Sequence, residues 1–270
     1  MTIAERAKTF AALHGGPKLL ILPNAWDAGS ARIVEHAGAK AIATSSAAVA
    51  WSHGYSDGQF LPFETLLATV REIVKTVSVP VSADIEGAYA QDAAAAAKTV
   101  GRVIEAGAVG INIEDGNDAP DLLARKIENL KAACAKAGAA LWVNARIDTY
   151  LFQLVAAEKA YGETVRRAAL YRSAGADSIF VPALTDLADL TRMVKDVVLP
   201  LNCLAREGLP DGAALEKIGV RRLSAGSGIG KVIQGETLTL AKAFLADGRS
   251  EPMTGGPLSY ADVNGLMRRG

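Results

Sequence analysis

The chain has 270 residues, half of them hydrophobic, so it is long enough for one α/β barrel or for two smaller domains. Its 29 Lys and Arg residues balance 29 Asp and Glu residues, and the formal net charge is zero. Nucleic acids and anionic membranes both require clustered positive charge, so the composition supports neither partner and favours a small molecule.

The cysteines and the N-terminal segment bear on the cellular compartment. Cys134 and Cys203 are the only cysteines in the sequence, which is too few for a disulfide framework and fits a reducing cytoplasm. The segment from Met1 to His14 includes Glu5 and lacks a continuous apolar stretch, so we expect an amphipathic helix and not a signal peptide. No run approaches the roughly 20 apolar residues that a membrane-spanning helix needs. We therefore expect a soluble, cytoplasmic protein.

Short apolar runs alternate with helix-like segments along the chain. Glycine follows several of these segments, at Gly38, Gly107, Gly138, Gly175 and Gly219, where it predicts a left-handed helix cap that leads into a strand. The predicted strands are 19–23, 41–45, 80–84, 109–114, 141–146, 178–182, 200–204 and 221–225. Each run is almost entirely apolar, as expected when both faces of a strand are covered.

Eight strands that alternate with helices in one chain of this length predict a (β/α)8 barrel, with a doubly wound sheet as the alternative. Neither a low-complexity segment nor a linker divides the sequence, so residues 1–270 are predicted to form a single barrel domain. The tail from 248 to 270 is rich in proline and glycine and interrupts the pattern. We expect it to form a C-terminal arm that packs on the barrel or on a neighbouring subunit.

The candidate site lies at the C-terminal ends of these strands, which form the working face of such barrels. Asp84 and Glu86 stand two residues apart at the end of the third run, so their side chains point to the same side. Glu114 and Asp115 close the fourth run. Clustered carboxylates repel one another, and an oxygen-only cluster suits a hard divalent cation such as Mg2+. The alternative is that Asp84 and Glu86 only cap the next helix.

Arg146 ends the fifth run and is the clear cation of the set. Its guanidinium group can bind a carboxylate or a phosphonate through two parallel hydrogen bonds. The alternative is an ion pair with Glu114 or Asp148 that only stiffens the rim of the barrel.

The order and spacing of these motifs resemble the isocitrate lyase and phosphoenolpyruvate mutase superfamily. The resemblance rests on NAWDAGS (24–30), TSS (44–46), Asp57, SADIEG (82–87), INIED (111–115) and NARID (144–148), and it extends from about Leu20 to Ala225. It implies a (β/α)8 barrel whose last helix is exchanged with a partner subunit, and assembly as a homodimer or homotetramer. It also implies bound Mg2+, with Mn2+ as an alternative, and substrates that are 2-oxo acids, their enols, or hydroxy acids that break down to them.

The resemblance also implies roles for individual residues. Asp84 would contact the metal directly, whereas Glu86, Asp57 and Glu114 would hold it largely through water. The residues implied to bind the substrate are Ser45, the backbone N–H groups of Ser46 and Ala47, Arg146 and, as a further contact, Asn202.

One departure from the family pattern limits the assignment of a reaction. Isocitrate and methylisocitrate lyases carry a mobile Lys-Lys/Arg-Cys-Gly-His segment shortly after the position of Glu114, and its cysteine protonates the departing carbanion. Here residues 114–120 read EDGNDAP, a short segment without cysteine, lysine or histidine. A truncated lid excludes less water, which favours a smaller or slower reaction.

Another residue must then supply the proton. His53, Tyr55 and Tyr89 lie in loops that we expect near the mouth of the barrel, and Tyr89 is the favoured candidate. Cys203 is expected to be buried among the helices. The candidate catalytic residues are Arg146, Glu114, Asp57 and Tyr89.

Three functions remain open at this point. The first is a Mg2+-dependent lyase that cleaves a C–C bond in, or decarboxylates, a small 2-oxo or 2-hydroxy acid through an enolate. The second is phosphoenolpyruvate mutase or phosphonopyruvate hydrolase chemistry at a P–C bond, which is weakened because phosphonyl groups need more cations than Arg146 alone. The third is a 2-oxo acid binding protein that kept the metal site and lost turnover.

Overall fold

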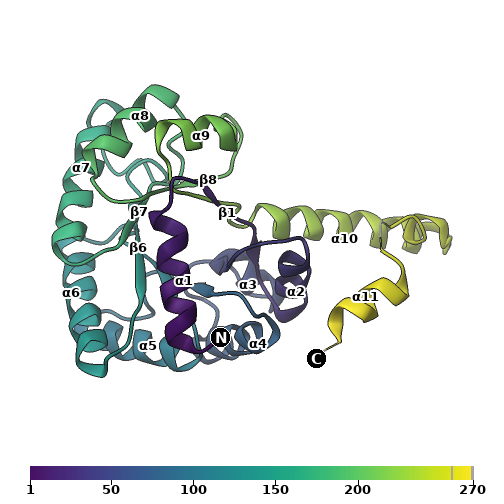
Figure 1. Cartoon of the computed structure of the whole chain (residues 1–270). Coiled ribbons are helices and arrows are strands. Elements are labelled where there is room, and N and C mark those ends of the chain that lie inside the picture. Colours follow the sequence, from purple (N-terminus) through teal and green to yellow (C-terminus); the bar gives the residue numbers. More distant parts are fainter. Residues whose placement is uncertain (257, 269–270) are drawn as a thin grey trace.

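Parallel strands form a closed ring at the centre of the computed structural model, which describes residues 1–256 and 258–268 (Figure 1). The strands are β1 (Leu20–Leu22), β2 (Asn24–Ala25), β3 (Ile42–Thr44), β4 (Val81–Asp84), β5 (Gly110–Glu114), β6 (Trp142–Arg146), β7 (Ser178–Phe180), β8 (Leu201–Leu204) and β9 (Arg222–Ser224). The ring confirms the predicted barrel of parallel strands and excludes the doubly wound sheet, which would leave two open edges.

The first predicted strand, 19–23, contains β1, and a further strand that was not predicted, β2, follows it directly. β1 pairs with β9, whereas β2 pairs with β3. Pro23 stands between them, and because proline has no N–H group it interrupts the ladder at this point. Residues 20–25 therefore close the ring, because β1 pairs with the last strand, β9, and β2 pairs with β3.

Helices surround the ring of strands, except that α1 closes one end and that α10 and α11 extend beyond the barrel (Figure 1). They are α1 (Ile3–Gly15), α2 (Ala28–His36), α3 (Ser46–Ser52), α4 (Phe63–Thr76), α5 (Ala93–Glu105), α6 (Pro120–Ala137), α7 (Ala157–Ser173), α8 (Leu187–Asp196), α9 (Gly212–Ile218), α10 (Gly228–Asp247) and α11 (Tyr260–Met267), with a 3-10 turn η1 (Glu251–Met253). In α4, Leu66, Leu67, Val70 and Ile73 are buried, the spacing that places one face of a helix against a sheet.

The predicted glycine caps are confirmed. The five glycines named above all have positive φ angles, the left-handed conformation that glycine adopts without a steric penalty. At Gly107 a side chain would also collide with its surroundings, because an added Cβ would lie 2.6 Å from Val74 Cγ1. This joint thus turns α5 sharply into β5.

Helix α1 closes the N-terminal end of the barrel, and it lies across the ring of strands in Figure 1. Phe10 is fully buried against Leu22, Ala43 and Val109 at the base of the strands. Gly110 makes room for this ring, since a Cβ there would lie 2.5 Å from Phe10 Cε1. Because this end is filled, the opposite, C-terminal end is the one that remains open to a substrate.

Helix α10 leaves the barrel and projects away from it, and α11 folds back toward α2 (Figure 1). Arg32 of α2 donates hydrogen bonds to the carbonyl groups of Leu266 (3.0 Å) and Arg268 (2.9 Å). Val232 and Leu245 on α10 are 61% and 84% exposed. The predicted arm, 248–270, follows α10, and within it Pro257, Arg269 and Gly270 lie outside the described residues. The exchange of a helix between subunits stays a prediction.

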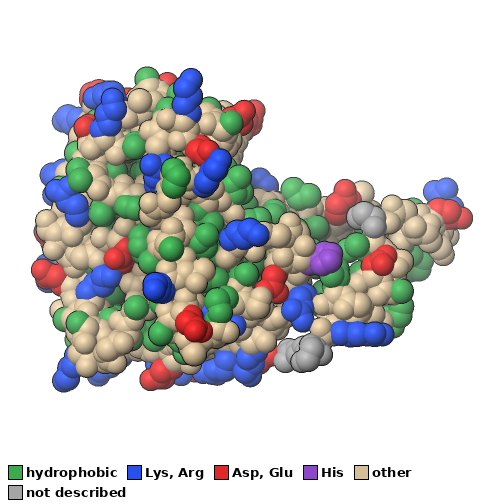
Figure 2. Space-filling model, in the orientation of Figure 1, with side chains coloured by type: hydrophobic (Ala, Val, Ile, Leu, Met, Phe, Trp, Pro, Cys, Tyr) green, Lys and Arg blue, Asp and Glu red, His purple; other side chains and the backbone are tan. Residues whose placement is uncertain are grey.

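The surface agrees with the balanced composition. Figure 2 shows Lys and Arg side chains interspersed with Asp and Glu side chains over the face of the barrel that carries α1. Across the described residues, no helix combines the length and apolar character needed to cross a membrane.

Candidate active site

A cavity of about 230 Å3 lies at the C-terminal ends of the strands. Its walls are formed by Asn24, Ser45, Ser46, Ala47, Asp57, Asp84, Asn112, Arg146, Leu151, Phe180, Pro182, Leu204, Ser224, Gly226 and Ser227. The structure therefore brings together six of the residues singled out from the sequence: Ser45, Ser46, Ala47, Asp57, Asp84 and Arg146. The cavity is smaller than typical sites for drug-sized ligands, so it suits a molecule of few atoms.

Asp84 ends β4 at the floor of this cavity and is buried. Its Oδ1 accepts the Glu86 N–H at 3.3 Å, and its Oδ2 accepts the Asn112 amide at 3.4 Å. Burial raises the pKa of Asp84, and the charge of Arg146 opposes that rise. The carboxylate has long hydrogen bonds and no cation in contact, so part of its charge remains uncompensated.

The loop after β4 is held in an unusual backbone conformation. Glu86 and Tyr89 have φ angles of 51° and 50°. Residues other than glycine rarely adopt this backbone conformation, which costs about 1 kcal/mol or more for each of them. Glu86 accepts the Gln59 N–H at 2.7 Å and the Tyr89 hydroxyl at 3.0 Å. Lys126 from α6 donates to the Gly87 carbonyl at 2.8 Å. Strain of this kind concentrates at functional sites, where the surroundings enforce it.

Arg146 forms both ion pairs that were considered as an alternative to substrate binding. Its Nη1 lies 2.6 Å from Glu114 Oε2, and its Nε lies 2.7 Å from Asp148 Oδ1. Although burial alone would lower the pKa of Arg146, Glu114 and Asp148 raise it above its ordinary value. These two bonds use two of the five guanidinium N–H groups. Since Arg146 also lines the cavity, the ion pairs orient it and leave donors for an anion.

Asp148 is itself fixed by a second buried acid. The Asp148 N–H donates to Asp115 Oδ1 at 3.0 Å. The other oxygen of Asp115 accepts hydrogen bonds from Arg167 at 2.9 Å and from Tyr171 at 2.7 Å. Asp115 thus belongs to the support of the rim and has no free oxygen directed at the cavity.

The acids around the cavity repel one another. Burial, followed by the charges of Asp57 and Asp84, raises the pKa of Glu86 to about 7. Burial also raises the pKa of Glu114 well above its ordinary value, with Arg146 opposing and Asp84 adding to the rise. Arg146 is the only cation among the lining residues. An oxygen-only donor set with this excess of negative charge fits a hard divalent cation.

The acids do not form a closed metal cage. Within 1–256 and 258–268, no three His, Cys, Asp or Glu side chains converge as direct ligands of one ion. Mg2+ commonly keeps several waters and takes only one or two carboxylates from the protein. A closed cage of protein ligands is therefore not required for Mg2+ to bind at this end of the barrel.

The remaining predicted residues lie around the cavity or below it. Glu86, Glu114 and Tyr89 are not among its lining residues, and the Tyr89 ring packs at 5.5 Å against that of Phe63. Asn202 is fully buried inside the barrel, where its Oδ1 accepts the Ser224 hydroxyl at 3.1 Å.

The other proton-donor candidates face elsewhere. His53 Nε2 lies 2.9 Å from Thr69 Oγ1 on α4, and Tyr55 is exposed. Cys203 lies in the hydrophobic core, as expected, and burial raises the pKa of its thiol to about 12. Tyr89, hydrogen-bonded to Glu86, remains the nearest of these candidates to the acids.

Several lining residues were not assigned a role from the sequence. Asn24 begins both β2 and the NAWDAGS motif, and its Oδ1 accepts the Gly226 N–H at 2.8 Å, which ties the first loop to the last. Phe180 ends β7, but the predicted strand extended to Pro182 and placed Phe180 in its middle, so the sequence did not mark it. Asn112 lies in mid-strand, opposite Asp84 in the register of β4 and β5; it belongs to the INIED motif, which gave it no role of its own.

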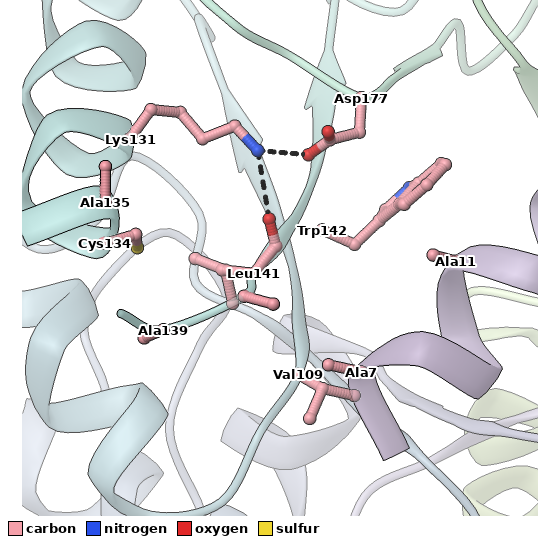
Figure 3. A pocket seen from close by; sticks show the side chains of 11 residues that line it. Ala7, Ala11, Val109, Lys131, Cys134, Ala135, Ala139, Leu141, Trp142 and Asp177 are labelled. Carbon is pink, nitrogen blue, oxygen red and sulfur yellow. Dashed lines mark hydrogen bonds and ion pairs between the residues drawn. The ribbon is translucent and has the colours of Figure 1, made fainter. Parts of the chain in front are cut away.

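A second cavity, of about 410 Å3, lies at the other end of the molecule beside α1 (Figure 3). Its charged groups are already paired, since Lys131 Nζ donates to Asp177 Oδ2 at 2.7 Å and to the Leu141 carbonyl at 3.1 Å. The remaining walls are mostly alanine and other apolar side chains. The C-terminal cavity, with unpaired acids, is therefore the candidate active site.

Comparison with known proteins identifies the family of the chain. The phosphoenolpyruvate phosphomutase family model matches residues 10–245. The chain belongs to the phosphoenolpyruvate mutase/isocitrate lyase superfamily. Among curated relatives, uncharacterized protein Rv1998c of Mycobacterium tuberculosis H37Rv is 35% identical over 81% of this chain and 82% of its own. The 2-methylisocitrate lyase of Escherichia coli K12 is 27% identical over 74% of this chain and 70% of its own.

Solved structures of the superfamily share the fold. A Burkholderia cenocepacia J2315 protein provisionally described as a lyase/mutase has a TM-score of 0.88 and 31% identity, over 97% of this chain and 95% of its own. A phosphonopyruvate hydrolase solved with oxalate and Mg2+ has a TM-score of 0.84 at 23% identity, over 97% and 94% of the two chains. The latter likeness concerns the fold alone.

Proposed function

We propose that the protein is a Mg2+-dependent lyase that cleaves a C–C bond in, or decarboxylates, a small 2-oxo or 2-hydroxy carboxylic acid. The observation that carries this proposal is the 230 Å3 cavity lined by Asp57, Asp84 and one cation, Arg146, with Glu86 and Glu114 close enough to these groups for their charges to interact. Breaking a C–C bond next to a carbonyl leaves an enolate, whose negative charge must be stabilised in place. Membership of a superfamily whose members act on small carboxylic acids supports the same chemistry.

Asp84 is the proposed direct metal ligand, and Asp57, Glu86 and Glu114 are proposed to hold the ion through water. Mg2+ is the expected ion, and Mn2+ can replace it because both favour oxygen ligands. When bound, the metal supplies positive charge beside the enolate oxygen and the carboxylate of the substrate.

The side chains of the cavity wall are proposed to bind and orient the substrate. Ser45 precedes α3, and the first N–H groups of a helix have no acceptor within it, so Ser46 and Ala47 can donate to a carboxylate or oxo oxygen. Arg146 would bind the second anionic group with its unused N–H groups. Leu151 and Phe180 make the opposite wall apolar, which limits the access of water.

Tyr89 is the proposed proton donor. Burial and the neighbouring charge of Glu86 raise the pKa of Tyr89 above its ordinary value, so its hydroxyl stays protonated and able to donate. The Tyr89 hydroxyl donates its hydrogen bond to Glu86 in the structure. It must therefore rotate away from Glu86 and toward the substrate to deliver the proton.

A second candidate function is P–C bond chemistry of the phosphoenolpyruvate mutase or phosphonopyruvate hydrolase type. It is favoured by the matching family model and by the phosphonopyruvate hydrolase fold. Arg146 is the one cation in the cavity lining, whereas a phosphonyl group carries up to two negative charges, and this favours the carbon acid. A 2-oxo acid binding protein without turnover is the remaining alternative.

We also propose that the protein is a homodimer or a homotetramer in which α10 packs on a partner subunit. The exposed apolar side chains of α10, among them Val232, Ile233, Leu238 and Leu245, would be covered by such an exchange. Contiguous exposed apolar surface of this kind marks protein interfaces.

The test is an NMR-monitored incubation of the protein with Mg2+ and a panel of oxaloacetate, 2-methylisocitrate, malate-type acids and phosphonopyruvate, with and without EDTA. Metal-dependent formation of pyruvate or glyoxylate from a carbon acid would support the lyase, and a change in the phosphorus signal would support the alternative.

Two variants complete this experiment. Asp84→Ala should abolish turnover, and Asp121→Ala, an exposed substitution on α6 with the same change of charge, should not. Binding of a 2-oxo acid without any conversion, in the presence of Mg2+, would contradict an enzymatic function on these substrates.

A further inference from the structure

Polar side chains fill the barrel interior below the candidate site. Asn112, Asn144, Ser178 and Arg222 are all buried inside the ring of strands, where such barrels usually hold branched apolar residues. A buried polar group is unfavourable unless it is hydrogen-bonded. The arrangement of these hydrogen bonds is therefore informative.

These side chains form one continuous series of hydrogen bonds from the base of the barrel to the candidate site, which we name the interior chain. Its links are Trp142 Nε1–H to Ser178 Oγ (2.8 Å), Ser178 Oγ–H to Asn144 Oδ1 (2.8 Å), Asn144 Nδ2–H to Asn112 Oδ1 (2.9 Å) and Asn112 Nδ2–H to Asp84 Oδ2 (3.4 Å). The last link is the longest and reaches the proposed metal ligand.

The direction of donation is fixed at the lower end of the chain. The indole of Trp142 can only donate, so Ser178 accepts there and directs its own proton to Asn144. The carbonyl oxygen of the Asn144 amide must then face Ser178. Its NH2 group consequently faces Asn112.

Arg222 fixes the direction a second time. Its Nη2 donates to Asn112 Oδ1 at 3.3 Å, and its Nε donates to Ser224 Oγ at 3.1 Å. A guanidinium group has no acceptor, so the oxygen of Asn112 faces two obligatory donors and its NH2 group faces Asp84. If the Asn112 amide were flipped, its NH2 group would face the N–H donors of Asn144 and Arg222, and its oxygen would face the Asp84 carboxylate.

The base of the chain is supported by α1. The ring of Trp142, which also borders the cavity in Figure 3, stacks on His14 with their centroids 4.4 Å apart. His14 Nδ1 donates to the Phe10 carbonyl at 2.8 Å. The helix that closes the N-terminal end thus holds the indole in the orientation that the chain requires.

Arg222 has no carboxylate within ion-pair distance among residues 1–256 and 258–268, although it is fully buried. Burial lowers its pKa to about 10, and Asp84 is the one charge that opposes this effect. The hydrogen bonds of Arg222 go to the uncharged side chains of Asn112 and Ser224, and Asn112 links it to the carboxylate of Asp84.

We propose that Asn112, Asn144 and Arg222 are positioning residues, which hold the Asp84 carboxylate in the orientation in which it takes the metal. Asn112 donates to Oδ2 and the Glu86 N–H donates to Oδ1, and because Asp84 lines the cavity, its remaining lone pairs are available to a metal there. This inference rests on the metal site of the proposed function, but the orientation of Asp84 can be measured without metal.

The test uses the full-length variants Asn112→Leu, which keeps the volume and removes the amide, and Ser178→Ala, which breaks a link remote from Asp84. Ile73→Ala, in the separate core between α2 and α4, is the control for general loss of stability. Metal-free crystal structures report the rotation of the Asp84 carboxylate, and titration followed by electron paramagnetic resonance reports the Kd for Mn2+.

We expect Asp84 to rotate in Asn112→Leu, with a Kd for Mn2+ at least tenfold higher, and a two- to fivefold increase in Ser178→Ala. Ile73→Ala should change neither. If Asp84 does not rotate in Asn112→Leu and the Kd for Mn2+ stays within twofold of the wild type, the inference is overturned. If Asn112→Leu does not fold, Ser178→Ala decides by the same two measurements. If wild-type protein binds no Mn2+, the proposed function fails, and the rotation of Asp84 alone decides the positioning role.

Discussion

The two ends of the barrel differ in packing, in the pairing of their charges and in backbone strain. At the N-terminal end, Phe10 fills the space above Gly110, and Lys131 and Asp177 are paired. At the C-terminal end, Asp84 and Glu86 are buried beside other acids, and the loop that carries Glu86 has positive φ angles. Departures from local preference are expected at functional sites, which supports the C-terminal end as the candidate active site.

Truncation of the closed end should have the largest effect on stability and the smallest effect on the site. Phe10→Ala removes a fully buried ring and should lower the free energy of unfolding by about 3–5 kcal/mol. Urea denaturation measures this change, and Phe60→Ala, which truncates an exposed ring, is the matched control at about 0.5 kcal/mol or less. A loss below 1 kcal/mol in Phe10→Ala would show that α1 does not secure this end.

The free energy of unfolding should fall as the pH rises, because of Glu86 at the open end. Glu86 has its pKa raised from 4.5 to about 7, so the folded protein binds this proton more tightly than the unfolded chain does. Without metal, Glu86 therefore lowers the free energy of unfolding between about pH 4.5 and pH 7, by up to about 3 kcal/mol.

Glu86→Gln removes that contribution, so the variant should gain stability relative to the wild type as the pH rises. Urea denaturation from pH 4.5 to 8 measures the difference. Glu158→Gln, on the exposed start of α7, should keep the pH dependence of the wild type. Parallel curves for Glu86→Gln and the wild type would contradict the raised pKa.

Replacing the cation of the open end should affect substrate binding without unfolding the protein. Arg146→Lys keeps the charge but loses the two-pronged geometry, and we expect KM to rise about 10- to 100-fold, equivalent to about 1.4–2.8 kcal/mol. Steady-state kinetics with the substrate identified by NMR measures this effect, and Arg125→Lys on the exposed side of α6 is the control. An unchanged KM would mean that the ion pairs with Glu114 and Asp148 are the whole role of Arg146.

A substitution on α10 should change neither the packing of the closed end nor the candidate site at the open end. Val232→Glu places a charge on the exposed apolar face of α10 and should dissociate the proposed oligomer while changing the stability of the single chain by about 0.5 kcal/mol or less. Sedimentation velocity measures the association, with Gln234→Glu on the same helix as the control. A wild-type protein that sediments as a monomer would contradict the proposed exchange of α10.

The sequence predicted the architecture because its signals are local. Glycines at helix ends and apolar runs placed each of the eight predicted strands to within about two residues, the usual uncertainty of such boundaries. The short strand β2 after Pro23 was not predicted, since it depends on which neighbours β1 and β2 pair with. Partner choice in a sheet is a long-range property that no local pattern encodes.

The site was predictable where polar residues end a strand and obscure where they lie within one. Asp84 and Arg146 interrupt apolar runs at the working face, and both line the cavity. Asn112 and Arg222 lie in strands covered on both sides, where the sequence does not show which side chains point inward. Asn202, expected at the mouth, is instead buried in the barrel interior, because it sits below the end of β8.

The most direct test of this account is the titration of purified wild-type and Asp84→Ala protein with Mn2+, with and without oxalate, by electron paramagnetic resonance. We predict saturable binding of one ion per chain in the wild type, tighter with oxalate, and at least 100-fold weaker in Asp84→Ala, with Asp121→Ala unchanged. Absence of saturable binding in the wild type, or equal affinity in Asp84→Ala, would contradict the claim that the acids of the open end form a metal site.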